Sequence, residues 1–286
     1  MEVIPSWQLE CLPVLIVWCD RALRVMGRVM VRKQRGVQSL EAGGQLLLAL
    51  ARSSTALPLK DLAREAKMTP ARAHPYLVSF GKLNLIEQDP VSGCYDLGTQ
   101  ALHVGLATLK RLSPIKIARE ELERREEGSQ YSSIISIWGN LGPTTVSFLE
   151  TNYPLSIYLR PGTVVSLLTT ATGKVFAAHL PKAVLKQSLK LDSQRYGGRP
   201  KPATKAELDE IIKEVRSVGF STNVGVTTPG VVAVSAPVFS HDGHLELVIT
   251  FIKPGTSADT QPESELVQNV KTCAARISER MGHQSA

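Results

Sequence analysis

The sequence predicts an α+β protein with a small helical domain that carries a two-stranded hairpin, a helical linker, and a larger domain built on an antiparallel sheet. Three observations favour this class. Apolar residues recur at helical spacing in two segments between residues 58 and 83, and two strand-like segments follow by residue 97. Residues 99–127 keep helical spacing. From residue 131 onward, β-branched runs alternate with capped helical segments, as in a sheet flanked by helices.

Length and charge set broad limits. With 286 residues, 43% of them apolar, the chain is long enough for two domains that each bury a core. The net charge of +7 is spread along the sequence, so it permits a phosphate-binding surface without requiring one. The cysteines form no C-x-x-C pair and no metal-ligand spacing, which favours reduced thiols in a cytoplasmic protein. They are Cys11, Cys19, Cys94 and Cys273.

The first 35 residues are predicted to form an extension that ends in a basic arm. Residues 12–19 are apolar but too few to span a bilayer, and the acidic Glu2 and Glu10 precede them, unlike in a signal peptide. We expect residues 1–29 to lie upstream of a natural start at Met30, with a packed amphipathic appendage as the alternative. A cationic arm can lie along a phosphate backbone. Its cationic residues are Arg32, Lys33 and Arg35.

Three helices are expected in the small domain. Residues 37–51 form the first. Its predicted buried side comprises Leu40, Leu47, Leu50 and Ala51. Residues 59–66 form the second helix, and Thr69 is a side-chain N-cap ahead of Pro70 at the first position of the third. The predicted buried face of the third helix consists of Ala73, Leu77 and Phe80.

A hairpin completes a winged helix-turn-helix. Residues 85–88 and 94–97 flank a Pro- and Gly-containing turn, which predicts two short strands. Helix, short turn, helix and hairpin is the order of this motif, whose second helix has the length to enter a DNA major groove. The hairpin tip around Ser92 and Gly93 would touch phosphates. Two helices and a hairpin also occur in small domains that bind no nucleic acid, and this is the alternative.

Two helices follow the hairpin, at residues 99–112 and 114–127, and form the predicted linker. Leu102, Leu106 and Leu109, here called the leucine seam, lie on one side of the first helix. Dimerisation through the linker is the expected use of this apolar pattern. Packing of the linker onto its own domain is the alternative.

The larger domain is predicted to hold an antiparallel sheet with helices at its sides. The predicted strands are residues 133–139, 144–150, 155–159, 231–239 and 245–252. The predicted helices are residues 171–179, 183–190, 204–218 and 263–281. Thr204 followed by Glu207 has the spacing of a capping box at the start of one of these helices.

Four short sequence blocks, taken together, have an order and spacing that can be compared with known families. They are residues 37–42 (VQSLEA), the hairpin stretch 85–98, residues 160–162 (RPG) with 170–174 (TATGK), and residues 229–238 (PGVVAVSAPV). Each block is weakly specific alone, but their order and separation from about Gly36 to Gly282 resemble the IclR family of bacterial transcriptional regulators. The resemblance implies an N-terminal winged helix, a helical linker and a GAF-like α/β effector-binding domain, assembled as dimers or dimers of dimers. The implied divisions are residues 1–35, 36–98, 99–128 and 129–286.

The resemblance also implies a small-molecule pocket. Its expected residues are Leu167, Thr170, Ala171, Thr172, Asn223, Ala233, Thr250 and Ile252. The start of the helix at residue 171 offers free N–H groups and a positive dipole end, which suit a carboxylate. Relatives often place acidic or polar side chains at the positions of Asn223, Ala233 and Ile252, so we infer a more apolar effector here, such as an aromatic carboxylic acid. In the alternative interpretation, these small residues and threonines only pack.

The expected partner of the winged domain is a double-stranded DNA operator. The residues expected to contact it are Arg32, Lys33, Arg35, Thr69, Ala71, Arg72, His74, Pro75, Ser79 and Lys82. Pro75 departs from the family, whose members usually carry arginine at this outward position of the recognition helix. Proline removes one helical hydrogen bond and crowds the carbonyl of Ala71. We therefore predict weaker or altered operator binding compared with relatives; a ligand sensor with weakened or lost DNA binding is the alternative.

The sequence offers no pattern typical of an enzyme, metal site or cofactor. His241-x-x-His244 lies in a predicted turn and lacks a neighbouring glutamate base. No G-x-S-x-G elbow is present, and residues 171–174 lack the upstream glycine of a P-loop. We expect a non-catalytic cytoplasmic protein without cofactor or membrane partner.

Overall fold

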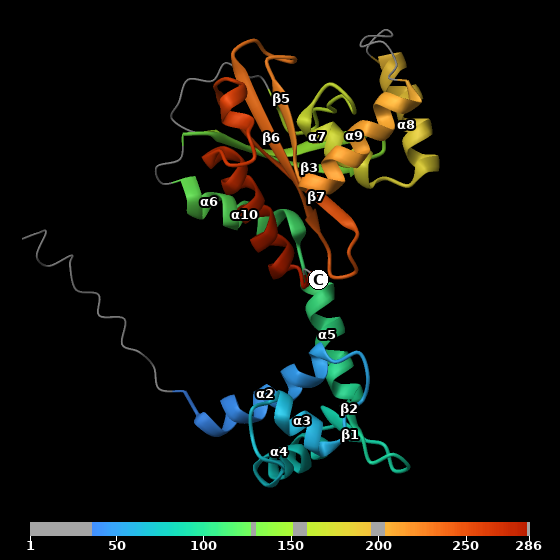
Figure 1. Cartoon of the computed structure of the whole chain (residues 1–286), viewed down its shortest axis with the longest axis vertical. Helices are drawn as coiled ribbons and strands as arrows, with labels where there is room; N and C mark the ends of the chain where they lie inside the picture. Colours follow the sequence, from blue (N-terminus) through green and yellow to red (C-terminus); the bar gives the residue numbers. More distant parts are fainter. Residues whose placement is uncertain (1–35, 127–129, 151–158, 196–203, 285–286) are drawn as a thin grey trace, which may run out of the picture. The chain divides into compact units, whose positions relative to one another are not determined.

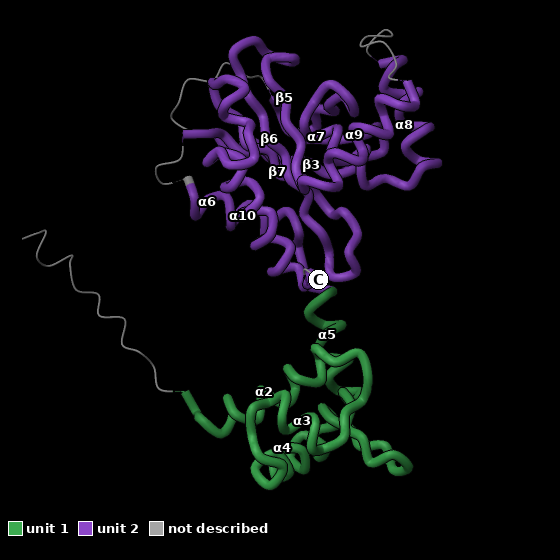
Figure 2. The backbone as a smooth tube through the Cα atoms, viewed as in Figure 1, with its two compact units in different colours: residues 1–109 green, residues 110–286 purple. Residues whose placement is uncertain are grey.

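The computed structural model describes residues 36–126, 130–150, 159–195 and 204–284. The chain divides into two compact units, residues 1–109 (unit 1) and residues 110–286 (unit 2), which Figure 2 colours separately. The predictions for the basic arm and for residues 155–158 of one strand lie outside the described residues. Within the described ranges, no helix combines the length and the apolar character that crossing a membrane requires.

The described part of unit 1 is a winged helix-turn-helix, as predicted (Figure 1). Its elements are α2 (Gln38–Arg52), α3 (Leu59–Glu65), α4 (Pro70–Lys82), β1 (Ile86–Gln88), β2 (Tyr95–Leu97) and the beginning of α5 (Thr99–Arg111). Three helices and the antiparallel hairpin surround one apolar core, which includes Leu46, Leu62, Leu77 and Ile86. Because each of these elements has only one apolar face, none buries that face without the others.

The predicted start and buried face of α4 are confirmed. Thr69 Oγ1 accepts a hydrogen bond from the N–H of Arg72 at 3.4 Å, which satisfies one of the free N–H groups of the first turn. Ala73 and Leu77 are buried, and Phe80 packs against the same core. The opposite side of α4 therefore faces away from the core of unit 1.

The buried side predicted for α2 is largely wrong. The buried residues of α2 are Gly43, Leu46, Ala49 and Leu50. Leu40 is 70% exposed and Ala51 is exposed, so only Leu50 of the predicted set is fully buried. A Cβ at Gly43 would lie 3.1–3.3 Å from ring atoms of Tyr76 and Phe80. The close approach of α4 at this glycine, rather than the leucine pattern, decides which face of α2 is buried.

Unit 2 is built on an antiparallel sheet with the strand order β4-β3-β7-β6-β5. Its strands are β3 (Ser132–Gly139), β4 (Gly142–Leu149), β5 (Ser221–Val224), β6 (Val231–Phe239) and β7 (Leu245–Pro254). Its helices are α6 (Pro114–Glu126), α7 (Ala171–His179), α8 (Lys182–Arg195), α9 (Lys205–Val218), the 3₁₀ turn η2 (Ser257–Thr260) and α10 (Glu265–Arg280). The predicted α+β class is confirmed.

Helices cover both faces of this sheet (Figure 1). α6 and α10 pack on one face, where Leu122 and Val270 meet Phe251 of β7. α7 and α9 lie on the other face, where Val175 packs in one cluster with Val248 of β7. Since side chains alternate along a strand, the odd-numbered residues of β7 from 247 to 251 face α10, and Thr250 and Ile252 face the α7 side.

The second helix predicted for the linker packs onto its own unit. Ala118 and Leu122 of α6 are buried in the core with α10, and the carboxylate of Glu121 is buried beside the guanidinium groups of Arg276 and Arg280. By contrast, α5 has no buried residue. The apolar pattern of residues 114–127 therefore serves the core of unit 2, while the leucine seam on α5 stays uncovered.

The capping box predicted at the start of α9 is confirmed in both directions: the Glu207 N–H donates to Thr204 Oγ1, and the Glu207 carboxylate accepts from the Thr204 N–H.

Several element boundaries differ from the prediction. β5 was not predicted, because Ser221–Val224 is too polar to show an apolar alternation. α8 continues to Arg195, five residues beyond the predicted end at residue 190, where the buried Asp192 joins it to a preceding loop.

Candidate functional site

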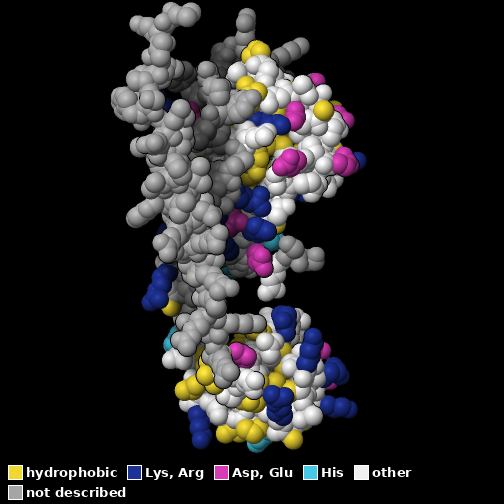
Figure 3. Space-filling model, turned by 90° about the vertical axis from the view of Figure 1, so that its left-hand side faces the viewer, with side chains coloured by type: hydrophobic (Ala, Val, Ile, Leu, Met, Phe, Trp, Pro, Cys, Tyr) yellow, Lys and Arg dark blue, Asp and Glu magenta, His cyan; other side chains and the backbone are white. Residues whose placement is uncertain are grey.

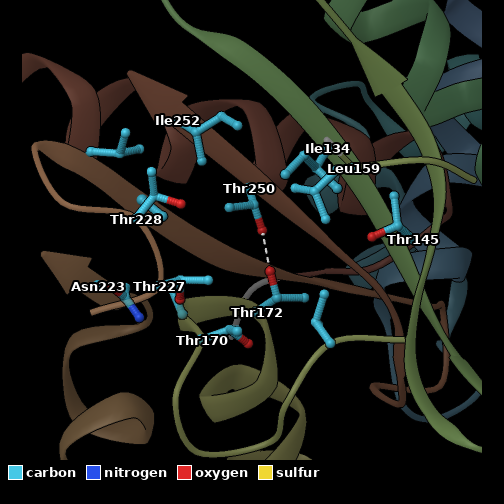
Figure 4. A pocket seen from close by; sticks show the side chains of 14 residues that line it. Ile134, Thr145, Leu159, Thr170, Thr172, Asn223, Thr227, Thr228, Thr250 and Ile252 are labelled. Carbon is cyan, nitrogen blue, oxygen red and sulfur yellow. Dashed lines mark hydrogen bonds between the residues drawn. The ribbon is translucent and has the colours of Figure 1, made fainter. Parts of the chain in front are cut away.

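Unit 2 contains a cavity of about 250 Å³ between the first turn of α7 and the face of the sheet on the α7 side. Seven of the eight residues predicted for a pocket line it: Thr170, Ala171, Thr172, Asn223, Ala233, Thr250 and Ile252. Figure 4 shows five of these side chains around one space: Thr170 and Thr172 at the start of α7, Asn223 on β5, and Thr250 and Ile252 on β7. The remaining lining residues were not predicted: Ile134, Thr145, Leu159, Val165, Thr227, Thr228 and Val231.

The register of the sheet explains why residues distant in sequence meet here. Thr250 of β7 lies opposite Ile134 of β3, and Ile252 lies opposite Ala233 of β6. Ala233 in turn pairs with Asn223 of β5. Directly paired residues of an antiparallel sheet point to the same face, so these side chains form the floor of the cavity.

Three buried hydroxyl groups tie α7 to this floor. Thr172 Oγ1 and Thr250 Oγ1 lie 2.8 Å apart, and Thr250 Oγ1 and Ser235 Oγ lie 2.7 Å apart. All three side chains are at most 6% exposed. Since the hydroxyls satisfy one another, their burial costs little, and they fix the first turn of α7 against the sheet.

The start of α7 presents free backbone donors to the cavity. Thr170 Oγ1 accepts from the N–H of Gly173 at 3.0 Å, and the Thr170 carbonyl accepts from the N–H of Lys174 at 3.1 Å. The N–H groups of Ala171 and Thr172 have no acceptor among the described residues. Two free N–H groups at the positive end of a helix dipole form a site suited to an anion.

Gly173 allows the loop before α7 to lie directly against the helix. A Cβ at Gly173 would lie 2.1 Å from the carbonyl oxygen of Ser166 and 2.6 Å from the Cα of Leu167. Leu167 was predicted to line the cavity, but it does not. Its side chain is 1% exposed and packs in the core with Val175 and Phe176, because the close contact at Gly173 turns it away from the cavity.

A buried carboxylate holds this loop in place. Asp192 of α8 accepts hydrogen bonds from the Ser166 hydroxyl at 2.9 Å and from the Leu167 N–H at 3.2 Å. No sequence signal indicated this role, because the two segments lie about 25 residues apart and share no motif.

We predict that Asp192→Ala lowers the free energy of unfolding by about 2 kcal/mol, because two buried donors lose their acceptor. Asp192→Asn keeps one acceptor oxygen and should cost about 1 kcal/mol or less. Urea unfolding of the purified protein measures both values. Equal losses for the two variants would show that the hydrogen bonds at residue 192 do not hold the loop.

Asn223 lines the cavity, but its amide is already engaged. Its Nδ2 donates to the carbonyl of Thr169, and its Oδ1 accepts from the N–H of Val226 at 3.3 Å. Lys174, one turn into α7, directs its ammonium to the carbonyl of Thr222 at 3.3 Å, and burial lowers the pKa of Lys174. The described lining thus contains hydroxyls, the engaged amide of Asn223 and apolar groups, but no charged side chain.

The side of α4 that faces away from the core carries every predicted DNA contact that the structure describes. These exposed residues are Thr69, Ala71, Arg72, His74, Pro75, Ser79 and Lys82. α4 continues through Pro75, which has no N–H to donate to the Ala71 carbonyl. The Ser79 hydroxyl donates to the Pro75 carbonyl at 2.9 Å. Arg32, Lys33 and Arg35 lie outside the described residues.

The wing (Ile86–Leu97) is acidic. It contains Glu87, Asp89 and Asp96 but neither lysine nor arginine. Asp89 accepts from the N–H and the hydroxyl of Ser92, which holds the pKa of Asp89 below its usual value; the turn therefore keeps this stabilising charge at neutral pH and loses it only in acid. These carboxylates argue against the predicted phosphate contact at the wing tip.

On the side that Figure 3 shows, the Lys and Arg side chains of unit 1 lie mostly along its right-hand edge, with few Asp and Glu side chains among them. Residues 36–109 contain six Lys and Arg and six Asp and Glu, so this part of the chain has no net charge. Attraction to a phosphate backbone must therefore depend on where the cations lie, rather than on their excess.

Each of the two units matches the model of a known protein family. Residues 39–90 match the model of the IclR helix-turn-helix domain. Residues 108–279, more than half of the chain, match the model described as bacterial transcriptional regulator IclR C-terminal. The chain belongs to the IclR family. It is thus a DNA-binding transcriptional regulator with a C-terminal effector domain, and not an enzyme.

Several known proteins are similar to this IclR-family regulator. The glycerol operon regulatory protein of Streptomyces griseus is 29% identical over 256 residues, which cover 87% of this chain and 98% of that protein. The crystal structure of Pseudomonas aeruginosa HmgR is 30% identical with a TM-score of 0.78, covering 87% of this chain and all of that one. The Agobacterium tumefaciens repressor BlcR, 20% identical with a TM-score of 0.70, covers 88% of this chain and supports the fold alone.

The lining residues that sequence reasoning missed have identifiable reasons. Ile134 and Thr145 lie on strands that were predicted, but the sequence did not indicate which face meets α7. Thr227 and Thr228 follow β5, which was not predicted. Within the described part of the regulator, no group of His, Cys, Asp or Glu side chains is arranged to hold a metal ion.

Proposed function

We propose that this cytoplasmic regulator binds a near-palindromic operator as a homodimer or dimer of dimers, and that a small aromatic carboxylic acid in the unit 2 cavity changes its operator affinity. In this proposal residues 36–98 bind DNA, residues 99–128 link the domains, and residues 129–286 bind the effector. The observation that carries the proposal is a largely apolar cavity with two free N–H groups at a helix start and no charged side chain in its described lining.

The lining favours a ring-bearing acid over a short aliphatic one. The carboxylate would accept hydrogen bonds from the N–H groups of Ala171 and Thr172. The ring would lie against Ile134, Ala233 and Ile252. A dry cavity of about 150 Å³ accommodates benzene, so about 250 Å³ leaves room for the ring and a carboxylate. The absence of a charged side chain in the described lining makes a second charge on the ligand unfavourable.

DNA binding is assigned to the exposed side of α4. In a dimer, two α4 helices would enter successive major grooves about 34 Å apart. The leucine seam supports dimerisation, because Leu102, Leu106 and Leu109 on α5 are 59%, 43% and 37% exposed, respectively. A second copy of the chain would cover such a surface. Effector binding would favour one arrangement of the linker helices, by no more than its difference in affinity for the two arrangements.

Two measurements test the proposal. Isothermal titration calorimetry of the full chain should detect aromatic acids in preference to short aliphatic ones, and binding confined to glyoxylate-like acids would refute the assigned effector class. Gel-shift titration with DNA from upstream of the protein's own gene should show a complex whose affinity the acid changes. Absence of any complex would favour the second candidate, a ligand sensor without DNA binding, which Pro75 and the acidic wing also support.

We expect the wing to repel the operator backbone. Glu87→Gln removes one exposed carboxylate and should raise operator affinity by about twofold to fivefold at low salt, less at high salt. Glu210→Gln, on the exposed side of α9 in unit 2, makes the same change in net charge and should have no effect. Fluorescence anisotropy with labelled operator at two salt concentrations measures both. An equal gain from the two variants would refute a role of the wing.

A further inference from the structure

One hydroxyl group in the wall of the cavity has no partner. Thr145 of β4 is fully buried, and its Oγ1 accepts or donates no hydrogen bond among the described residues. Its backbone is paired, because its N–H donates to the Thr163 carbonyl and its carbonyl accepts from the Gly162 N–H. In Figure 4, the side-chain oxygen of Thr145 is directed into the cavity, on a different side from Thr170 and Thr172.

A buried hydroxyl without a partner is unfavourable, and such groups are rare in folded proteins. Valine has nearly the same shape as threonine and would fill this position without that cost. The other hydroxyls of the floor, those of Thr172, Ser235 and Thr250, pair with one another and need no ligand. Thr227 and Thr228 are not fully buried. Among the described residues that line the cavity, Thr145 is therefore the fully buried hydroxyl whose hydrogen bond the fold leaves open, at a wall separate from the carboxylate site.

We propose that the effector carries a second polar group, a hydroxyl or carbonyl on the ring away from its carboxylate, and that Thr145 Oγ1 hydrogen-bonds to it. This inference rests on the proposed function, since it assumes that the carboxylate lies at the start of α7. Thr145 then selects hydroxylated aromatic acids over the unsubstituted acid. A polar group built to meet a ligand hydroxyl discriminates strongly against the analogue that lacks it, because the protein group is then left unpaired.

The neighbouring strand offers a matched control. Ser136 of β3, the cross-strand partner of Thr145, is also fully buried with an unpartnered hydroxyl, but it does not line the cavity. Ser136→Ala therefore removes a hydroxyl of the same kind from the adjacent position without touching the proposed ligand contact. Thr145→Ser keeps the hydroxyl and removes only a methyl group.

Calorimetry of the full chain with benzoate and its 2-, 3- and 4-hydroxy derivatives tests the inference without assuming the position of the hydroxyl. At least one hydroxybenzoate should bind about tenfold or more tightly than benzoate. Thr145→Val should reduce this preference to within about twofold while benzoate affinity stays unchanged. Ser136→Ala and Thr145→Ser should keep the preference. The melting temperature of ligand-free Thr145→Val should not fall, because no hydrogen bond is lost.

The outcomes separate the two proposals. Two outcomes would refute the role of Thr145 but not the proposed carboxylate site. In the first, benzoate and all hydroxybenzoates bind with equal affinity; in the second, Thr145→Val keeps the preference for a hydroxybenzoate. Binding of none of the four acids would overturn the aromatic-acid proposal and the inference with it. A fall of several degrees in the melting temperature of Thr145→Val would show that the hydroxyl serves the fold instead.

Discussion

Gly173→Ala should destabilise unit 2 by about 2–3 kcal/mol, and more if the helix cannot shift. The new Cβ would lie 2.1 Å from the Ser166 carbonyl oxygen and 2.6 Å from the Leu167 Cα, and both are backbone atoms. The loop cannot move aside easily, because Asp192 holds the Ser166 hydroxyl and the Leu167 N–H. Either the loop or the first turn of α7 must therefore be displaced.

The same substitution should weaken the binding of aromatic acids by about tenfold or more, which corresponds to a loss of about 1.4 kcal/mol or more in binding free energy. The free N–H groups of Ala171 and Thr172 would move with the first turn of α7, away from the position that a bound carboxylate would occupy. Urea unfolding and calorimetry measure the two effects separately. The chain offers a matched control in Gly44→Ala, since a Cβ at this helical glycine meets no atom within 4 Å.

Gly44→Ala should stabilise the protein by about 0.5–1 kcal/mol, because alanine favours the helix and meets no obstacle. If the free energies of unfolding of Gly173→Ala and the parent protein agree within about 0.5 kcal/mol, the loop must be able to move enough to accommodate a methyl group. In that case, the close contact at Gly173 would not be what positions the start of α7.

Pro75→Ala should stabilise unit 1 by up to about 3 kcal/mol, the usual difference between alanine and proline inside a helix. Alanine restores an N–H that can donate to the Ala71 carbonyl. Pro75→Arg should show a similar gain in stability and, in addition, bind operator about tenfold more tightly than Pro75→Ala, because the exposed position gains a guanidinium that can reach phosphate or base edges.

Anisotropy titrations at fixed salt compare the two Pro75 variants with the parent protein. Gln45→Arg adds the same charge at an exposed position of α2 and controls for net charge. If Pro75→Arg binds the operator with the same affinity as the parent protein, or with a lower one, the assignment of α4 as the recognition helix is contradicted. A gain matched by Gln45→Arg would mean that charge, and not position 75, determines binding.

Much of the fold could be predicted because local chemistry determines it. Thr69 ahead of Pro70 marks the start of α4 by a side-chain hydrogen bond and a compatible backbone, and neither requires tertiary contacts. The Thr204 and Glu207 capping box is likewise local, and it forms as expected. The β-branched runs at residues 231–239 and 245–252 predicted two strands, and β6 and β7 form there.

Features that depend on contacts between distant segments were not predictable in this way. The buried side of α2 follows from the rings of Tyr76 and Phe80 at Gly43, not from the spacing of its leucines. Leu167 turns into the core because α7 approaches its backbone at Gly173. Neither contact leaves a periodic signal in the sequence, because each depends on which residues a second element brings close.

By itself, the sequence determined the order of the elements, their capped starts and the outward side of α4, and its resemblance to the IclR family indicated most of the polar residues around the cavity. Only the tertiary structure decided which hydrogen bonds the polar groups around the cavity make. The Asn223 amide donates to a backbone carbonyl, the hydroxyls of Thr172 and Thr250 pair with each other, and the Thr145 hydroxyl has no partner among the described residues. The physical reason is that an amphipathic pattern and a helix cap arise from neighbours within one or two turns. Satisfaction of a buried polar group depends instead on atoms that strand register and helix packing bring together from across the chain.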